Sequence, residues 1–421
     1  MRNIVFIGNC QAWMVFNVYR LHIAPKRAET VDYVPAYEDA DAAAMERINS
    51  ADLIVFQVTD VAQKVPMPTG IRVVLFPHVT AFFLWPFFEG KHPCDADIPA
   101  QYRRPFTHAY GDKWLDREIS RGADPSSLAA RYRDLDVVKV TNLDRRIELC
   151  VAAQRARDVR ADTRFGDCIT DRLTSEYVFT HPHHPSAALC RIMAREVFSR
   201  MDCETQEIEA ALLTCRHTLF PYWQIPVHPG IADHLRLAWA SPDRKYSFAF
   251  GERVTWSEYC DRYVAHDWGR ELQDCLARAQ QSEDLSRADL TSLAAEMETA
   301  ASRYASADGL FALSKIRARL GDVDGAIEAA ASALGSAPYA WYYQTHLALL
   351  LSEAGRLDEA LTVAEDVVEW MLHLPDPHIT LAIVQKRRGC REAMRRAARA
   401  ALAIAPDNAR ARRVLADAEM A

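Results

Sequence analysis

Close to the N-terminus, Gly8-Asn9-Cys10-Gln11 is the first group of residues that could carry out chemistry. The tetrapeptide follows a short apolar run, so Cys10 is expected where a strand meets the first turn of a helix. There, unpaired backbone N–H groups and the helix dipole favour the thiolate, which would lower the pKa of the cysteine and make it a nucleophile. The amides of Asn9 and Gln11 could then stabilise an oxyanion. The alternative interpretation is a buried cysteine in a tight turn.

Three histidines within four residues form the second candidate group. His181, His183 and His184 end the strand-like run over residues 177–186. Histidine is the usual base for a cysteine or serine nucleophile near neutral pH. The same residues could instead hold a metal, given acidic or cysteine ligands elsewhere, or form a surface loop punctuated by prolines.

An aromatic, apolar run over residues 73–88 and a glycine-containing turn further on form the third group. His78 follows a strand end within the run, and Gly111 and Asp112 lie in the turn. A run of this kind is usually the wall of a core. Beside a strand end, however, it could line an apolar slot for a pantetheine arm or an acyl group.

The elements that must position these groups alternate between strands and helices. Short β-branched runs over residues 3–10, 51–58, 71–77 and 136–142 predict strands, and residues 11–22 have helical spacing. This alternation predicts an α/β domain with an open, mostly parallel sheet and helices on both faces, similar to flavodoxin-like and SGNH folds. Open sheets of this type bind ligands at the carboxyl ends of their strands, where Cys10 would lie.

The C-terminal third of the chain contains a repeat. Gly321, Gly355 and Gly389 are spaced by 34 residues, and each opens a similar phrase. Residues 306–421 therefore resemble about three tetratricopeptide repeats, with a capping helix over 408–420. We predict an acyltransferase-like domain over 1–267, a connecting helix within 268–305 and an all-α repeat array over 306–421.

Composition limits the class of protein further. Half of the 421 residues are hydrophobic, a quarter are charged, and the formal net charge of −7 argues against coating of nucleic acid or anionic membrane. No two of the ten cysteines form a CxxC pair, and nucleotide-binding glycine motifs, GxSxG and HExxH are missing from the sequence. The most apolar run holds two prolines and a histidine, so we expect no membrane span and a cytoplasmic protein.

Taken in order, these motifs resemble the WcbI-type polysaccharide-biosynthesis acetyltransferases. That family has a GNCQ-like motif after its first strand, an FPN-like strand end, a GD turn and an FTFNHPTN-like motif before a helix. The matching residues here are 8–11, 76–78, 111–112 and 180–186, and the resemblance extends over about residues 1–267. His78 replaces the asparagine of the FPN-like motif, and the histidine motif is one residue longer.

The resemblance implies coenzyme A-dependent O-acetyl transfer to a sugar hydroxyl of a polysaccharide, such as a capsule precursor, without a metal. Cys10 would attack the thioester, with His184 as base and Asp112 orienting it, although His181 or His183 could be the base instead. Alternatively, His184 would deprotonate the hydroxyl for direct attack. The residues expected to form the oxyanion and substrate site are Gly8, Asn9, Gln11, His78, Gly111 and His181. Arg103 and Arg104 are candidates for binding the phosphates of the coenzyme.

Two other function classes stay open. The first is an SGNH-like esterase or deacylase, in which water would resolve the acyl-enzyme. The second is a non-catalytic, glycan-binding scaffold, because tetratricopeptide arrays usually bind peptides or proteins. In an enzyme, the array would bind a protein partner such as a glycosyltransferase. The basic helix face near the C-terminus is either solvated or contacts an acidic partner, and no nucleic-acid partner is expected. Its arginines are Arg387, Arg388, Arg391, Arg395, Arg396 and Arg399.

Overall fold

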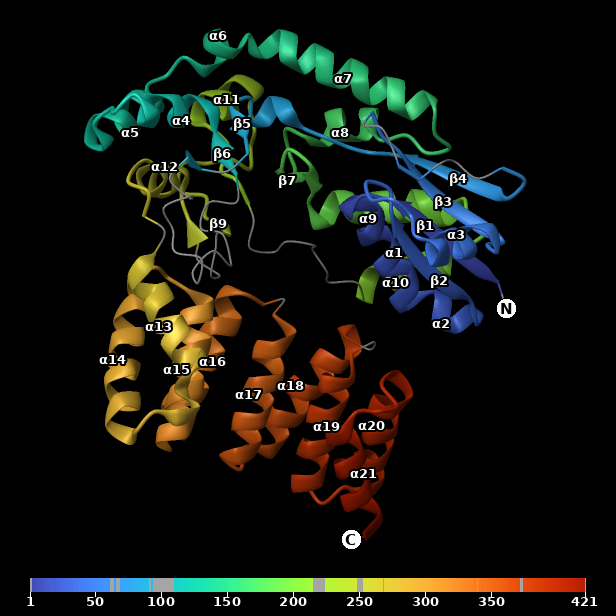
Figure 1. The fold of residues 1–421 in the computed structure, drawn as a ribbon, viewed down its shortest axis with the longest axis vertical. Coiled ribbons are helices and arrows are strands. Elements are labelled where there is room, and N and C mark those ends of the chain that lie inside the picture. The colour runs from blue at the N-terminus through green and yellow to red at the C-terminus, as the bar shows by residue number, and fades with distance from the viewer. Residues whose placement is uncertain are drawn as a thin grey trace. The chain divides into compact units, whose positions relative to one another are not determined.

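The chain forms two compact units in the computed structural model. The structure describes residues 2–60, 64–65, 69–90, 92–93, 110–214, 224–247, 253–267, 269–338, 340–371 and 374–420. The first unit holds the described residues up to Tyr246 together with Val254–His266, and the second holds the helices that follow Asp267. The first unit is an α/β domain and the second is all-helical (Figure 1).

Four strands of the first unit form one parallel sheet in the order β2-β1-β3-β4. They are β1 (Asn3–Gly8), β2 (Thr30–Pro35), β3 (Leu53–Val58) and β4 (Arg72–Pro77). Three short pairs complete the strands: β5 (Phe88–Glu89) with β6 (Gly111–Asp112), β7 (Phe179–His181) with β8 (His184–Pro185), and β9 (Tyr246–Ser247) with β10 (Arg253–Val254). The strand order reverses between β1 and β3, which is the position at which open sheets bind ligands.

Most of the chain between these strands is helical. The helices of the first unit are α1 (Cys10–His22), α2 (Ala24–Arg27), α3 (Ala42–Asn49), η1 (Phe82–Leu84), α4 (Lys113–Ser120), α5 (Pro125–Arg133), α6 (Val137–Thr141), α7 (Leu143–Val159), α8 (Gly166–Arg172), α9 (Ala187–Ser199), α10 (Thr205–Thr214), α11 (Pro229–Leu235) and α12 (Trp256–Val264). Across the described ranges, no helix is both long and apolar enough to cross a membrane.

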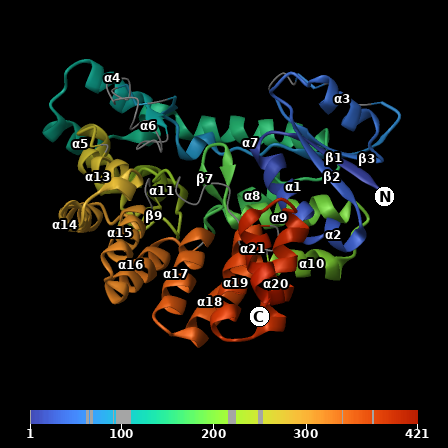
Figure 2. The same ribbon diagram turned by 60° about the horizontal axis from the view of Figure 1, so that its bottom comes forward.

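Both faces of the sheet are covered by helices. Alternate residues of β1 point to opposite faces, so Ile4 and Phe6 pack against α1 and α9, whereas Val5 and Ile7 pack against α3. Figure 2 shows α3 on one side of the strands and α1 on the other. The predicted α/β class, with a parallel sheet between two helical layers, is confirmed.

One predicted strand is wrong, and one strand of the four-stranded sheet was missed. Residues 136–142 form helix α6, because Asp136 caps it by accepting a hydrogen bond from the backbone N–H of Lys139. The β-branched residues of this segment therefore pack from a short helix. Strand β2 is a border strand whose charged Asp32 interrupts the apolar pattern, which is why the sequence did not indicate it.

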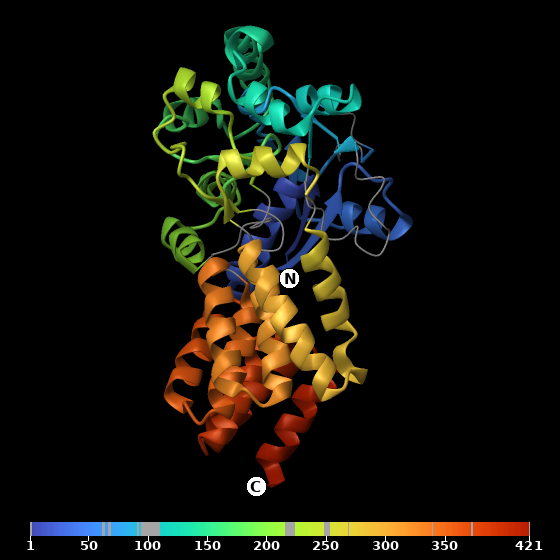
Figure 3. The same ribbon diagram turned by 90° about the vertical axis from the view of Figure 1, so that its left-hand side faces the viewer.

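The second unit is a row of antiparallel helices (Figure 3). It contains α13 (Arg270–Gln280), η5 (Ser282–Asp284), α14 (Arg287–Arg303), α15 (Ala307–Leu320), α16 (Val323–Ser336), α17 (Trp341–Glu353), α18 (Leu357–Trp370), α19 (Pro375–Arg387), α20 (Arg391–Ile404) and α21 (Ala409–Met420). Three helical hairpins, α15–α16, α17–α18 and α19–α20, followed by α21, match the predicted repeat. The segment expected as one connecting helix holds two helices, α13 and α14.

The repeated glycines have a clear conformational reason. Gly321, Gly355 and Gly389 each lie between the two helices of a hairpin, with φ values of 83°, 77° and 75°. Residues with a side chain rarely adopt this left-handed conformation, whereas glycine adopts it without strain. The 34-residue spacing in the sequence therefore reports the position of each turn.

Candidate active site

The β1–α1 junction brings Cys10 to the carboxyl end of the sheet, beside the end of β3. The turn is tight: a Cβ atom on Gly8 would lie 2.7 Å from the Cβ of Gln57. Asn9 is the N-cap of α1, and its Oδ1 accepts a hydrogen bond from the backbone N–H of Gln11 at 2.9 Å. The backbone N–H of Asn9 donates to Oε1 of Gln57 at 3.0 Å. These contacts fix Cys10 as the first residue of the helix.

The central contact of the site joins Cys10 to His184. The Sγ atom of Cys10 lies 3.0 Å from Nε2 of His184, although the two residues are 174 positions apart in sequence. Cys10 is half-buried, whereas His184 is 7% exposed. At this distance a thiol can pass its proton directly to an imidazole, which is how a histidine activates a cysteine nucleophile.

A hairpin formed by β7 and β8 presents the histidine. Thr180 donates a hydrogen bond from Oγ1 to the carbonyl oxygen of His184 at 3.2 Å, and Ser186 caps α9 directly after the hairpin. The ring of His181 lies 3.9 Å from the ring of His184 and is fully buried. Of the three histidines in the motif, it is His184 that has a hydrogen bond to Cys10.

Gln11 holds the site together rather than offering a donor to an oxyanion. It is fully buried, and its Nε2 donates to the carbonyl oxygens of Val79, at 2.8 Å, and His183, at 2.7 Å. Its Oε1 accepts from the backbone N–H of Val79 at 3.1 Å and from Nε2 of Gln57 at 3.3 Å. Both protons of the amide are therefore already used, and the prediction that Gln11 stabilises an oxyanion is wrong.

Burial sets the protonation state of the reactive pair. It raises the pKa of the Cys10 thiol to about 11, and the backbone N–H groups of Gln11 and Cys10 oppose this shift without cancelling it. Burial, followed by the neighbouring His183, lowers the pKa of His184 to about 3. The expected lowering of the thiol pKa by the helix N-terminus is therefore wrong, because desolvation dominates. At neutral pH both groups are neutral, and the thiol donates to Nε2.

His78 and His183 form a second layer of rings beside this pair. Their ring planes are 10° apart, with centroids 6.3 Å apart, and the ring of His183 packs edge-on against Phe82 at 4.7 Å. Burial lowers the pKa of His78 to about 3, with a further contribution from the positive charge of Arg157. His78, which the sequence placed in the substrate site, therefore lies next to the histidine hairpin as a neutral imidazole.

The predicted link between Asp112 and the histidine is replaced by other contacts. Asp112 is the N-cap of α4, and its Oδ1 accepts hydrogen bonds from the backbone N–H groups of Trp114, at 3.0 Å, and Leu115, at 2.9 Å. Its Oδ2 accepts from the hydroxyl of Tyr132, and burial raises the pKa of this carboxyl to about 7. Asp112 thus organises the start of α4, whereas Gly111 pairs with Glu89 of β5, and the prediction that Asp112 orients the base is wrong.

Two predicted residues cannot be placed, and two contributing residues were missed. Arg103 and Arg104 lie outside the described residues, so their contact with phosphates stays a prediction.

Gln57 was missed, although it is the polar residue in the otherwise apolar run of β3, and this was the available signal. Tyr33 was also missed: its hydroxyl donates to the carbonyl oxygens of Gly8, at 3.0 Å, and Asn9, at 3.1 Å, from the strand that the sequence did not indicate.

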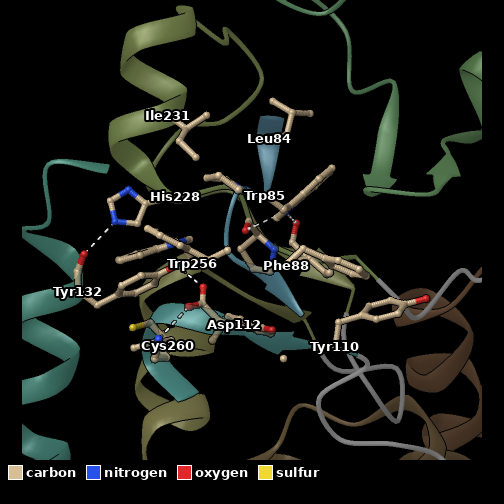
Figure 4. A pocket seen from close by; sticks show the side chains of 17 residues that line it. Leu84, Trp85, Phe88, Tyr110, Asp112, Tyr132, His228, Ile231, Trp256 and Cys260 are labelled. Carbon is tan, nitrogen blue, oxygen red and sulfur yellow. Dashed lines mark hydrogen bonds between the residues drawn. The ribbon is translucent and has the colours of Figure 1, made fainter. Parts of the chain in front are cut away.

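An aromatic pocket adjoins the histidine hairpin (Figure 4). Phe88 and Tyr110 line the pocket, and their rings also contact the hairpin: Phe88 lies 5.4 Å from His183, and Tyr110 lies 4.8 Å from His181. The arrangement therefore combines a cysteine, a neutral imidazole base and an adjoining apolar cavity. In the described part of the chain, no cluster of three histidine, cysteine, aspartate or glutamate side chains could hold a metal ion.

A protein-family model matches the N-terminal part of the chain. Residues 3–206 match the family model described as "Polysaccharide biosynthesis enzyme WcbI". The predicted WcbI-type resemblance is thus confirmed over these residues, and its extension to residue 267 stays a prediction. No curated protein matches the chain.

Solved structures resemble each part of the chain. A structure of WcbI, described as a native protein without a disulfide bond between coenzyme A and a cysteine of that protein, is 15% identical; the match covers 75% of this chain and 99% of that chain, with a TM-score of 0.49. A tetratricopeptide protein of Thermus thermophilus is 20% identical; the match covers 35% of this chain and 81% of that chain, with a TM-score of 0.31. YrrB, a tetratricopeptide protein with an unusual peptide-binding site, is 16% identical; the match covers 37% of this chain and 78% of that chain, with a TM-score of 0.31.

Proposed function

We propose, from the premise that residues 3–206 are a WcbI domain, that this protein transfers an acyl group from a coenzyme A thioester to a sugar hydroxyl in polysaccharide biosynthesis. Cys10 is the nucleophile and His184 the base. The observation that carries the proposal is the distance of 3.0 Å between Sγ of Cys10 and Nε2 of His184. The choice of coenzyme A and of a sugar acceptor follows from the family resemblance.

The first step forms an acyl-enzyme. As Sγ of Cys10 attacks the carbonyl carbon of the thioester, its proton passes to Nε2 of His184, because the resting thiol is neutral. The tetrahedral intermediate collapses, the carbon–sulfur bond to coenzyme A breaks, and the coenzyme leaves as a thiol with the proton from the imidazolium. One thioester is exchanged for another, so this step needs no other energy source.

The second step transfers the acyl group to the acceptor. His184 takes the proton of the sugar hydroxyl while the hydroxyl oxygen attacks the carbonyl carbon of acyl-Cys10. An ester bond forms, the bond to Sγ breaks, and the proton passes from the imidazolium of His184 to the departing thiolate, which restores the thiol of Cys10. The imidazole of His184 is unprotonated at neutral pH, so its Nε2 can accept this proton.

Two further groups are proposed to bind the reacting atoms. The Oδ1 atom of Asn9 caps α1, and Nδ2 has no hydrogen-bond partner among the described residues, so Nδ2 can donate to the oxyanion. Nε2 of His181 is buried without a partner among those same residues and is proposed to bind the substrate. In the alternative, direct mechanism, His184 deprotonates the acceptor and Cys10 only shapes the site.

The helical array is proposed to bind a protein partner, such as a glycosyltransferase that supplies the sugar acceptor. Stacked helical hairpins form extended surfaces on which other proteins bind, and the array has no part in the chemistry described above. Removing residues 409–420, which form the last helix, tests this: binding of a purified partner enzyme is expected to weaken while acylation of Cys10 continues.

The test compares release of coenzyme A with and without an acceptor. The full chain is incubated with acetyl-CoA, or longer acyl-CoA, and a panel of methyl glycosides and sugar nucleotides, with the Cys10→Ala variant as control. A transferase releases coenzyme A at a rate that rises when the correct acceptor is present, and the product is an acylated sugar. Equal release without any acceptor would indicate an esterase, and no release from any donor would favour the scaffold interpretation.

A further inference from the structure

The aromatic pocket of Figure 4 shares its residues Phe88 and Tyr110 with the surroundings of the histidine hairpin. Two of its partly exposed lining residues are Phe88 and Tyr110, whose rings contact His183 and His181. Because the ring of His181 lies 3.9 Å from that of His184, ring contacts join the base to this wall of the pocket. A group attached to Sγ of Cys10 that extends along these rings would enter it.

The lining of the pocket is mainly apolar. Its volume is about 540 Å³, including the space at the open mouth. Leu84, Trp85, Leu115, Ile231 and Trp256 line it, and none of these side chains is more than 8% exposed. Concave sites of this composition bind groups whose apolar surface is removed from water.

Three polar side chains in the pocket wall, those of Trp85, His228 and Tyr132, already have partners. Nε1 of Trp85 donates to the carbonyl oxygen of Ile225 at 3.0 Å. His228 is bonded through Nε2 to the carbonyl oxygen of Tyr132 at 2.8 Å, and the hydroxyl of Tyr132 is bonded to Asp112. These groups are therefore not available for the hydroxyls of a sugar or the phosphates of a coenzyme, and binding either there would leave polar atoms without partners.

We propose that the pocket binds the acyl chain of the donor, and that the chain is longer than acetyl. This inference rests on the proposed function and defines the donor substrate of the same site. An acetyl group has one methyl beyond its carbonyl carbon and would end beside the histidine rings, leaving the pocket unused. A hexanoyl or octanoyl chain would pass Tyr110 and bury its methylenes among the aromatic and aliphatic walls.

A chain-length series tests the proposal in the full chain. Acylation rates are measured by intact-protein mass spectrometry with acetyl-, butyryl-, hexanoyl- and octanoyl-CoA. Each buried methylene is worth about a fourfold gain in rate constant at low substrate concentration, so hexanoyl-CoA should exceed acetyl-CoA by at least about tenfold. Acetyl-CoA as the fastest donor would overturn the proposal.

Variants in the pocket identify where the chain binds. Ile231→Phe fills the pocket and should lower the ratio of hexanoyl to acetyl rates at least about fivefold, whereas Leu115→Ala should shift the preference toward octanoyl. Ile208→Phe is the matched control, since Ile208 is equally buried in α10 and does not line the pocket. An unchanged ratio in both pocket variants, or an equal change in the control, would contradict the proposal.

A binding measurement separates this proposal from the proposed function. Trp85 and Trp256 line the pocket, so their fluorescence reports binding of acetyl- and hexanoyl-CoA to the Cys10→Ala variant, which cannot be acylated there. Tighter binding of hexanoyl-CoA supports the acyl pocket even if no donor acylates the wild type, in which case the proposed function alone fails. Equal binding of the two donors overturns the acyl pocket even if acetyl transfer is found.

Discussion

Two parts of the molecule place a hydroxyl or thiol 3.0 Å from Nε2 of a histidine, and only one of them is suited to chemistry. The first pair is Cys10 with His184 in the α/β unit, and the second is Ser314 with His346 in the helical array. Ser314 is fully buried within α15, and its hydroxyl also donates to the carbonyl oxygen of Ala326 at 2.7 Å. Because the single hydroxyl proton is already used, His346 must donate to Ser314 and cannot act as its base.

The surroundings of the two pairs explain the difference. Cys10 is half-exposed at the carboxyl end of a parallel sheet, and the hairpin that carries its base adjoins a pocket, whereas Ser314 joins α15 to α16 and α17 between packed helices. Both histidines are neutral, since burial lowers the pKa of His346 to about 4 and that of His184 to about 3. A short distance and a neutral imidazole are therefore not sufficient; a free proton and access for substrate are also needed.

The largest effect is expected from removing the base of the first pair. His184→Gln should slow acylation of Cys10 by about 10²–10⁴-fold, because the thiol proton loses its acceptor. Stopped-flow measurement of coenzyme A release checks this. His183→Gln is the matched control in the same hairpin, since His183 packs on Phe82 and should affect the rate far less. If the His184 variant and the wild type acylate Cys10 at equal rates, His184 is not the base, and the Cys10–His184 pair no longer differs in function from the Ser314–His346 pair.

The second-largest effect is expected from replacing Gln11, whose side chain holds the Cys10–His184 pair in place. Gln11→Leu keeps the volume but leaves the backbone N–H of Val79 and two carbonyl oxygens without partners. A loss of about 3 kcal/mol in the free energy of unfolding is expected, together with slower acylation because the hairpin that carries His184 is released. Urea unfolding and acylation rates measure both. A variant as stable as the wild type would show that Gln11 does not position the hairpin.

Acid should weaken the α/β unit through its buried histidines. The pKa of His181 is lowered to about 2, and the pKa values of His78 and His184 to about 3, each mainly by burial. Between the unfolded value near 6.5 and these folded values, the unfolded chain binds more protons, so stability is complete above about pH 6.5 and falls below it. Each histidine contributes a slope of up to about 1.4 kcal/mol per pH unit.

The measurement is urea unfolding at several pH values between 7 and 4. In His181→Gln, stability should fall less steeply over this range than in the wild type, because one proton fewer is taken up on unfolding. The acylation rate of the folded wild-type protein should stay constant over the same range, since His184 remains a base. A rate that falls with a midpoint near pH 6.5 would indicate that His184 titrates as a solvated histidine.

The smallest effect on stability and acylation is expected from replacing Ser314 of the Ser314–His346 pair. Ser314→Ala removes hydrogen bonds between α15 and its neighbours and should cost about 1 kcal/mol of stability. It should leave the rate of Cys10 acylation within error of the wild type, in contrast to the His184 variant. Thermal unfolding and coenzyme A release give the two values. A large loss of acylation would show that the array takes part in the chemistry.

The sequence was most informative where local spacing determines the structure. Gly321 and the glycines that follow it at 34-residue intervals mark turns whose left-handed backbone favours glycine, so the helical hairpins could be predicted. The apolar runs ending at Gly8 and Pro77 likewise predicted two strands of the sheet. Residues 136–142 show the limit of this approach, because the cap at Asp136 overrides the β-branched pattern.

Features of the site that depend on long-range contacts could not be predicted. The GNCQ motif and the histidine motif indicated the reactive residues, but the distance between Cys10 and His184 arises from packing of segments 174 residues apart. The buried role of Gln11 depends in the same way on distant partners, whereas Asp112 caps α4 through the nearby Trp114 and Leu115, so its capping role has a local origin. The sequence also places Cys10 at a helix N-terminus without revealing that burial outweighs the dipole and raises the thiol pKa.

Mapping of the acyl group after rapid quenching tests the central claim most directly. The full chain is mixed with an acyl-CoA donor, quenched in acid and digested, and the peptide containing Cys10 is analysed by mass spectrometry. The account predicts one acyl group on this peptide, as a thioester that hydroxylamine removes and that is absent in Cys10→Ala but retained in Ser314→Ala. Consumption of the donor with an unmodified Cys10, or an acyl group found on another residue, would contradict it.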